Sequence, residues 1–207
     1  LSSFFTGEGK TFCSTYLSQL ISMTDKKILL IDFDLHKPKI HKTFGLTNSI
    51  GMSSYIIGKA DLGDIIQKDV KPNLDLILAG PIAPNPSELV LRKEVEKILS
   101  EVREMYDYII IDTAPFGILN DTLELVKIVD VFLIVLNTKY TKSRGVAHIE
   151  QVFGKYDDVK IGLILNSIKE KRIRYYYTKY ASRYTYGYNY SYGYGYGNYG
   201  DEEEADS

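Results

Sequence analysis

The chain has 207 residues, enough for one α/β domain with a substantial core, and its 44% hydrophobic and 25% charged residues are ordinary for a globular protein. A net charge of −2 argues against a general affinity for polyanions, and the single cysteine, Cys13, excludes an internal disulfide and fits a reducing compartment. No stretch approaches the length of a membrane-spanning helix and the first residues do not resemble a signal peptide, so we expect a soluble chain.

The first element is a glycine-rich loop at Gly7–Thr11, followed at once by helical spacing of apolar residues over 10–22. Glycines let backbone N–H groups turn toward a phosphate, and the N-terminus of the following helix adds its positive dipole end. In such a loop Lys10 reaches the β- and γ-phosphates and the Thr11 hydroxyl binds Mg²⁺. The G-x-x-x-x-G-K-[ST] motif is incomplete because Phe4 replaces its first glycine, so a simple tight turn is the alternative.

A phosphate-binding loop normally follows a buried strand, and Leu1-Ser2-Ser3 look like only the end of one. We therefore expect the chain to be an N-terminally truncated part of a longer protein. A membrane anchor in the remaining part is compatible with this sequence.

Later strands and helices alternate along the chain. Ser87 is the expected N-cap of a helix that carries apolar residues from Leu91 to Met105, and the proline-rich stretch before it, 81–86, is an expected loop. Shorter helices are expected at Thr122–Lys127 and Ser143–Phe153. Apolar runs predict five strands: Ile28–Asp32, Leu74–Leu78, Tyr108–Asp112, Val131–Leu136 and Ile161–Leu165. This alternation predicts an α/β fold, a P-loop NTPase-like parallel sheet with helices on both faces.

Beyond about Lys169 the composition changes to basic residues, and Tyr175–Tyr199 holds all but six of the 18 tyrosines. From Tyr184 onward tyrosine alternates with small and polar residues, before an acidic end at 201–204. A segment with so much glycine and no aliphatic residues cannot form a packed core, so we predict a disordered tail.

Two of the predicted strands end in a carboxylate, Asp32 and Asp112, and Asp34 follows the first of them closely. A single aspartate at a strand end is most often a cap or turn residue. Together with a Gly-Lys-Thr loop, however, these carboxylates favour a nucleoside triphosphate site, because phosphoryl transfer needs acidic groups to hold a metal and a group to orient or deprotonate the nucleophile.

Four segments resemble motifs of the bacterial tyrosine kinases, the cytoplasmic kinases of capsule and exopolysaccharide assembly. Residues 28–41 (ILLIDFDLHKPKIH) resemble their second acidic motif, 108–115 (YIIIDTAP) their Walker B segment, and 85–89 (NPSEL) another typical segment. The tyrosine-rich end resembles their autophosphorylation cluster. The resemblance covers nearly the whole chain and also accounts for Phe4, since this family commonly lacks the first glycine of the loop.

The resemblance implies a kinase domain at 1–172 and an autophosphorylation tail at 173–207, with ATP and Mg²⁺ as cofactors. Asp32 is the candidate acceptor of the tyrosine proton, with a pure metal role as the alternative, and Lys10 would neutralise phosphate charge. Metal ligands would be Thr11, Asp34 and Asp112, directly or through water. Nucleotide contacts would come from Gly7, Glu8, Gly9, Lys10, Thr11 and Phe12, and from Asn166 at the adenine. The phosphoacceptor candidates are Tyr184, Tyr186, Tyr188, Tyr190, Tyr192, Tyr194, Tyr196 and Tyr199.

The sequence departs from the family at His36, where an arginine is usual, so any phosphate or interface contact of that arginine is in doubt. Thr6 replaces a common proline. The family's N-terminal helix, which helps to build ring-shaped oligomers, is absent, so we do not expect this chain alone to form them. Several phosphates on the tail, each adding about −1.5 to −2 charges, should detach it and loosen assembly.

The implied partners are the tail of a second subunit in a homo-oligomer of the full-length protein, a membrane activator or fused membrane domain, and a phosphotyrosine phosphatase. The implied location is the cytoplasmic face of the bacterial inner membrane, and no nucleic acid is expected, although the basic stretch 169–183 is compatible with one. The main alternative function is a partition- or division-positioning ATPase whose nucleotide state controls dimerisation. A catalytically inactive scaffold is a third possibility.

Overall fold

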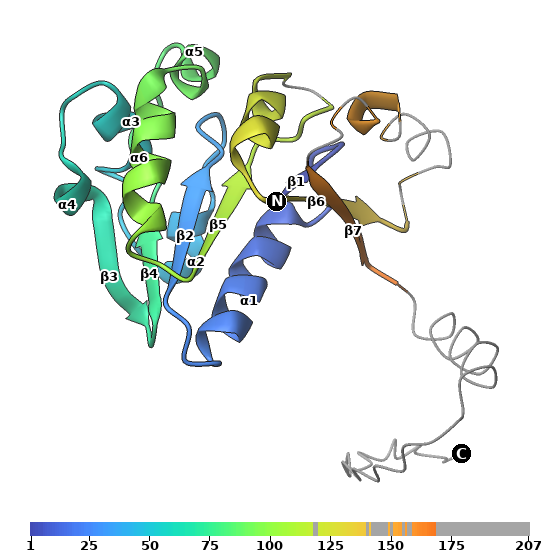
Figure 1. The fold of residues 1–207 in the computed structure, drawn as a ribbon, viewed down its shortest axis with the longest axis horizontal. Coiled ribbons are helices and arrows are strands. Elements are labelled where there is room, and N and C mark those ends of the chain that lie inside the picture. Colours follow the sequence, from blue (N-terminus) through green and yellow to red (C-terminus); the bar gives the residue numbers. More distant parts are fainter. Residues whose placement is uncertain are drawn as a thin grey trace, which may run out of the picture. The chain divides into compact units, whose positions relative to one another are not determined.

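A four-stranded sheet with helices on both faces and a three-stranded sheet form the body of the described part of the chain (Figure 1). The structure, a computed structural model, describes residues 1–117, 120–139, 141, 149, 151–154, 156 and 159–168. Its strands are β1 (Ser2–Ser3), β2 (Ile28–Phe33), β3 (Ile66–Lys71), β4 (Leu74–Ile77), β5 (Tyr108–Thr113), β6 (Val131–Asn137) and β7 (Lys160–Asn166). Its helices are α1 (Lys10–Ser22), α2 (Ile40–Phe44), α3 (Met52–Ile56), α4 (Leu62–Ile65), α5 (Pro86–Val90), α6 (Lys93–Arg103) and the 3₁₀ helix η1 (Asn120–Ile128).

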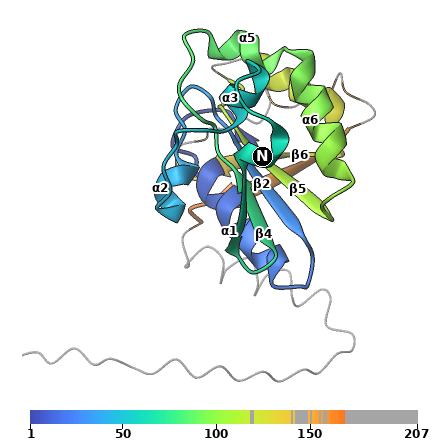
Figure 2. The same cartoon turned by 90° about the vertical axis from the view of Figure 1, so that its left-hand side faces the viewer.

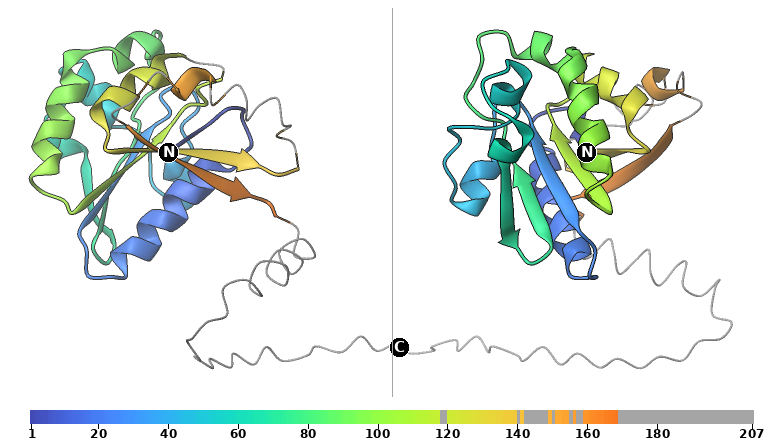
Figure 3. Two further views of the ribbon diagram at one scale, coloured as in Figure 1. Left: turned by 45° about the vertical axis from the view of Figure 1, so that its right-hand side comes forward. Right: turned by 60° about the vertical axis from the view of Figure 1, so that its left-hand side comes forward.

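The strands lie in the orders β3-β4-β2-β5 and β1-β6-β7, and all pairs are parallel except β3 with β4. Figure 3 shows β6 and β7 running side by side. The short β1 also joins the larger group, because Leu1 donates to the Ile111 carbonyl at 2.6 Å and accepts from the Thr113 amide at 3.1 Å. The register places Asp32 directly opposite Asp112.

Each face of the larger strand group packs against its own helices (Figure 2). Alternate β2 residues divide between the faces: Leu29 and Ile31 pack toward α3 and α6, whereas Ile28 and Leu30 pack on the side of α1 and α2. Since β2 is buried on both faces, it reads as the continuous apolar run that predicted a parallel strand. The predicted fold class is confirmed.

Helix α1 forms where its spacing predicted it, but most of its large apolar residues face outward. Ser14, Thr15, Ser18 and Ser22 are buried, whereas Phe12, Tyr16 and Leu20 are exposed, and only Leu17 and Ile21 pack on the sheet side. The buried Ser18 hydroxyl donates to the Ser14 carbonyl at 2.7 Å. Such small side chains let the helix lie close to the sheet, which the apolar pattern could not indicate.

Other predictions about this half of the chain need correction. Ser87 is not an N-cap, because α5 begins at Pro86 with Asn85 as its N-cap residue. The single helix expected through Leu91 is interrupted there, and Leu91 is 62% exposed between α5 and α6. The antiparallel strand β3 and the short helices α2, α3 and α4 were not predicted. The helix expected at Ser143–Phe153 falls mostly outside the described residues, within which 149 and 151–153 are helical. No helix in the described part of the chain is long and apolar enough to span a bilayer.

We predict that Tyr106→Phe lowers the free energy of unfolding by about 1–2 kcal/mol, because it leaves a buried carboxylate oxygen without its donor. The Tyr106 hydroxyl donates to Asp75 at 2.7 Å, and both residues are buried. Urea titration of both variants measures the change. Tyr108→Phe, at a half-exposed ring two residues away, is the matched control, and an equal loss there would contradict the assignment.

Candidate active site

The glycine loop connects β1 to α1 with two residues in the left-handed region, Gly7 at φ 84° and Gly9 at φ 97°. Gly9 occupies the N-cap position of α1 without a side-chain cap, which leaves the first N–H groups of the helix for a ligand. A Cβ at Gly9 would collide with the side-chain amide of Asn166. The left-handed conformation therefore favours glycine at this position, and any other residue would also have to displace the Asn166 amide.

Glu8 lies inside the loop and is only 2% exposed. Its carboxylate accepts the Phe5 amide at 2.8 Å and the Thr141 hydroxyl at 2.6 Å. Its backbone carbonyl accepts the Asn166 amide at 2.9 Å. The loop is thus bound to residues that follow β6 and to the end of β7. Sequence reasoning missed Thr141, because nothing in the local pattern indicates a contact across 133 residues.

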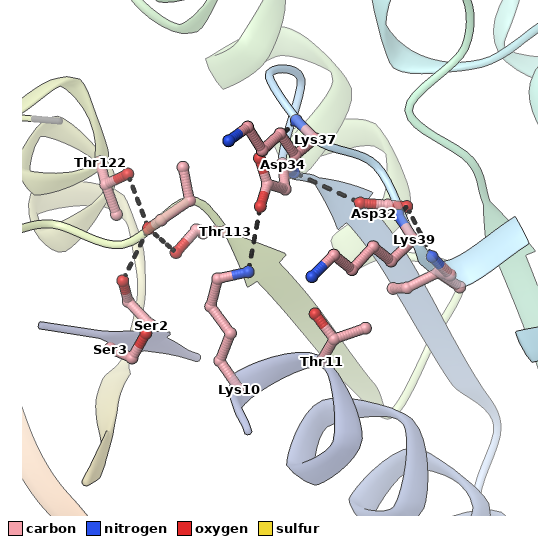
Figure 4. A network of polar contacts seen from close by, with 12 residues as sticks. Ser2, Ser3, Lys10, Thr11, Asp32, Asp34, Lys37, Lys39, Thr113 and Thr122 are labelled. Carbon is pink, nitrogen blue, oxygen red and sulfur yellow. Dashed lines mark hydrogen bonds and ion pairs between the residues drawn. The ribbon is translucent and has the colours of Figure 1, made fainter. Parts of the chain in front are cut away.

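Lys10 and Asp34 form a largely buried ion pair at 3.0 Å, with side chains that are 10% and 8% exposed (Figure 4). Lys10 comes from the first turn of α1, and Asp34 follows the end of β2. The structure therefore brings together two residues that were assigned separately to phosphate and metal binding. Phe12, also predicted at the nucleotide, is 58% exposed and its ring lies 4.3 Å from that of Tyr16.

Asp112 is 1% exposed, and its Oδ1 has no hydrogen-bond partner among the described atoms. Burial raises its pKa above the ordinary value of 3.8, while Lys10 and a hydrogen bond from Thr11 act in the opposite direction. A carboxylate that stays charged here would gain from a cation in contact with that oxygen. Thr11 and Asp112, two of the three predicted metal ligands, are thus in contact.

The segment after β5 is anchored beside this site. The Ala114 carbonyl accepts the hydroxyls of Ser2 at 2.8 Å, Thr113 at 3.2 Å and Thr122 at 3.2 Å (Figure 4). These bonds tie β1, β5 and η1 together next to Asp112. The position of the Asp112 carboxylate therefore depends on three separate segments of the chain.

Asp32 is fully buried and its two oxygens accept backbone amides of the segment that follows β2. Oδ1 accepts from Asp34 at 3.3 Å, and Oδ2 accepts from Lys39 at 3.3 Å and Ile40 at 3.1 Å. Burial raises its pKa to about 7 and the charge of Asp112 adds to the rise, against the lowering effect of the amides. Asp32 thus organises the loop and titrates near neutrality.

From this shift we predict that the contribution of Asp32 to the free energy of unfolding falls as the pH rises from about 4 to about 7. In that window the unfolded chain has released the Asp32 proton, whose ordinary pKa is 3.8, while the folded chain still holds it. The stabilising contribution is complete below pH 4 and lost above pH 7. Denaturant titrations with EDTA at several pH values give the free energy of unfolding as a function of pH. Between about pH 4 and pH 7 this free energy should change less steeply with pH in Asp32→Asn than in wild type. Asp130→Asn, at a carboxylate that is 83% exposed, should keep the wild-type slope.

His36 connects two of the recognised motifs. Its Nε2 lies 3.3 Å from the Ser87 hydroxyl in α5, so the segment after β2 meets the NPSEL segment beside the acidic residues. The residue that departs from the family pattern therefore has a definite contact, which sequence reasoning did not anticipate.

The predicted phosphoacceptors Tyr184–Tyr199 and the rest of the tail lie outside the described residues. Within the described part, no group of three or more histidine, cysteine or acidic residues forms a metal cluster. Cys13 is a free, half-buried thiol whose pKa burial raises.

The residues present fit a magnesium nucleotide. The loop leaves helix N–H groups and Lys10 for phosphates, and the unpartnered Asp112 oxygen beside Thr11 offers hard oxygen ligands to the metal. Asn166 is expected to contact the adenine. Its side-chain amide nitrogen donates to the Glu8 backbone carbonyl, so the adenine contact stays a prediction.

Comparisons with known proteins identify relatives of this chain. Residues 3–162 match the family described as AAA domain. The tyrosine-protein kinase YwqD of Bacillus subtilis is 31% identical over 84% of this chain and 74% of its own length. The tyrosine-protein kinase CpsD of Streptococcus agalactiae is 33% identical over 86% of this chain and 78% of its own length. In contrast, the chain matches only 22% of the length of the Escherichia coli tyrosine-protein kinase etk.

Solved structures of related proteins share the fold of this chain. The kinase domain of Escherichia coli tyrosine kinase ETK superposes with a TM-score of 0.77 and 31% identity, over 93% of this chain and 70% of that one. The septum site-determining protein MinD of Pyrococcus horikoshii, solved with Mg-ADP, shares the fold at a TM-score of 0.67 and 21% identity, over 82% and 70% of the two chains. Motifs, fold and relatives together show that this chain belongs to the bacterial tyrosine-protein kinases.

Proposed function

We propose that this chain uses Mg·ATP to phosphorylate the tyrosines of its own C-terminal tail, in trans between subunits. The observation that carries the proposal is the meeting of Lys10, Asp34 and the unpartnered Asp112 oxygen at the N-terminus of α1. Family membership supports tyrosine rather than water as the acceptor, and the tyrosine-rich tail supplies acceptors within the same chain.

Each site residue has a proposed task. Lys10 neutralises charge on the β- and γ-phosphates, and Thr11, Asp34 and Asp112 hold Mg²⁺ directly or through water. Mg²⁺ held by these residues would offset the negative charge of the phosphates. As the tyrosine oxygen bonds to the γ-phosphorus and the bond to ADP breaks, Asp32 accepts the phenolic proton. Its pKa of about 7 supports this role, whereas its complete burial favours the alternative role beside the metal.

The test is to incubate the full chain with Mg·ATP and to look for phosphotyrosine by mass spectrometry. We expect label on Tyr184–Tyr199 and none without Mg²⁺. An unlabelled chain that still hydrolyses ATP, even with the membrane activator, would support the partition-type ATPase instead. An unlabelled chain without hydrolysis would support the inactive scaffold.

A mixing experiment tests transfer between subunits. One chain carries Lys10→Met with an intact tail, and the other has a wild-type site but phenylalanine at the eight candidate tyrosines. We expect label on the tail of the inactive chain, at a rate that rises with the concentration of the active one. Label that appears only in unmixed wild-type protein would mean transfer within one chain.

We further propose that the kinase controls surface polysaccharide polymerisation and export at the inner membrane, with a membrane activator and a phosphatase as partners. The resemblance to capsule and exopolysaccharide kinases supports this. Support for a partner also comes from a solved chimera named CapA2B2, to which this chain is 26% identical with a TM-score of 0.76. In a strain that lacks the kinase, wild type should restore normal polysaccharide chain length and Lys10→Met should not.

A further inference from the structure

The segment between β2 and α2 is held by hydrogen bonds to the two acidic side chains Asp32 and Asp34. Asp34 accepts the Lys37 amide at 3.0 Å, and Asp32 accepts the amides of Lys39 and Ile40. Pro38, which has a fixed φ, lies between the two lysines, and the Ile40 side chain is fully buried. The backbone at Lys39 is therefore positioned by the carboxylates of the candidate active site.

From this backbone the Lys39 side chain extends toward the space between Lys10 and Thr11 (Figure 4). Lys37, its near neighbour, lies on the side of Asp34 away from Lys10 in the same view. Lys39 is exposed, and within the described residues it forms no salt bridge. It thus carries a positive charge that no salt bridge within the described residues compensates.

The charge balance of the site favours a second cation near the phosphates. Lys10, the cation of the loop, is already paired with Asp34 at 3.0 Å, so part of its charge is compensated before any ligand arrives. Two ammonium groups directed toward one space repel each other unless an anion lies between them. A lysine ammonium is a compact point charge with three donors, which suits a phosphate oxygen.

We propose that Lys39 binds the terminal phosphate of the nucleoside triphosphate, opposite Lys10. This inference rests on the proposed nucleotide-dependent function and adds a phosphate-binding residue that the phosphate loop does not contain. A contact with the terminal phosphate distinguishes triphosphate from diphosphate. Lys39 would therefore help the site to retain ATP and to release ADP.

The experiment measures binding of ADP and of a non-hydrolysable ATP analogue to the full chain with Mg²⁺, by calorimetry. Lys39→Met removes a charge-assisted hydrogen bond to phosphate. It should lower the affinity for the ATP analogue by about tenfold or more and leave the affinity for ADP within about twofold of wild type. Lys39→Arg should restore most of the loss. Lys37→Met, on the same loop and with the same change of charge, should bind both nucleotides like wild type.

The outcomes separate this inference from the proposed function. Equal weakening of both nucleotides in Lys39→Met, or no weakening of either, overturns the role of Lys39 even if wild type phosphorylates tyrosine. The same loss in Lys37→Met also overturns it, since only the general charge of the loop would then matter. Failure of the wild-type chain to bind either nucleotide overturns both proposals. Thermal unfolding of each variant shows whether it is folded.

Discussion

Lys10→Met is expected to reduce tail phosphorylation by about 100- to 1,000-fold, the usual cost of removing one preorganised group that stabilises charge in a transition state. The Lys10 ammonium is held in place by a largely buried ion pair, so it is oriented before the nucleotide binds. Phosphotyrosine formed per minute, measured by mass spectrometry on the full chain, gives the size of the effect.

The same substitution should also destabilise the fold, because Asp34 would keep a buried charge without its partner. Breaking a buried pair in this way costs on the order of 3 kcal/mol. The double variant Lys10→Met/Asp34→Asn removes both charges, and it should recover stability without recovering activity.

Lys26→Met is the control for a surface pair, since Lys26 and Asp107 lie 3.3 Å apart with side chains that are 50% and 42% exposed. It should leave phosphorylation unchanged. If the Lys10→Met/Asp34→Asn variant regained activity along with stability, the direct role of Lys10 at the phosphates would be wrong.

Asp112→Asn is expected to lower the rate of phosphorylation but to raise the free energy of unfolding. Loss of a metal-binding carboxylate should reduce phosphorylation by about 100-fold or more and raise the Mg²⁺ concentration needed for half-maximal rate. Stability with EDTA should rise at neutral pH, because burial raises the pKa of Asp112 and the charged form is therefore unfavourable in the folded chain. An asparagine oxygen can still accept the Thr11 hydroxyl.

Activity at several Mg²⁺ concentrations and denaturant titration of the same preparations measure the two effects. Asp107→Asn is the control, since this exposed carboxylate accepts the Lys27 amide at 2.8 Å and its pKa is lowered by that bond. It should lose some stability at neutral pH and keep its activity. A variant at Asp112 that was both less stable and fully active would contradict the assignment.

Sequence alone determined those features of the protein that depend on local pattern. Uninterrupted apolar runs predicted β2 and β5, because strands buried on both faces need apolar side chains at every position. The loop and the acidic residues at the strand ends predicted a nucleotide site, because carboxyl ends of parallel strands meet at one edge of a sheet. Motif order then indicated the family. The roles of the individual site residues and of the tail remain predictions.

Only the tertiary structure decided which side chains meet. The Glu8–Thr141 contact, the antiparallel β3 and the outward face of α1 depend on distant segments, whose contacts leave no periodic signal in the chain. The same is true of Lys39, which in the sequence is one of several basic residues after Asp34. The Lys39 backbone is held by Asp32, and its side chain extends toward the space between Lys10 and Thr11 (Figure 4), a geometry that a pattern of residue types cannot contain.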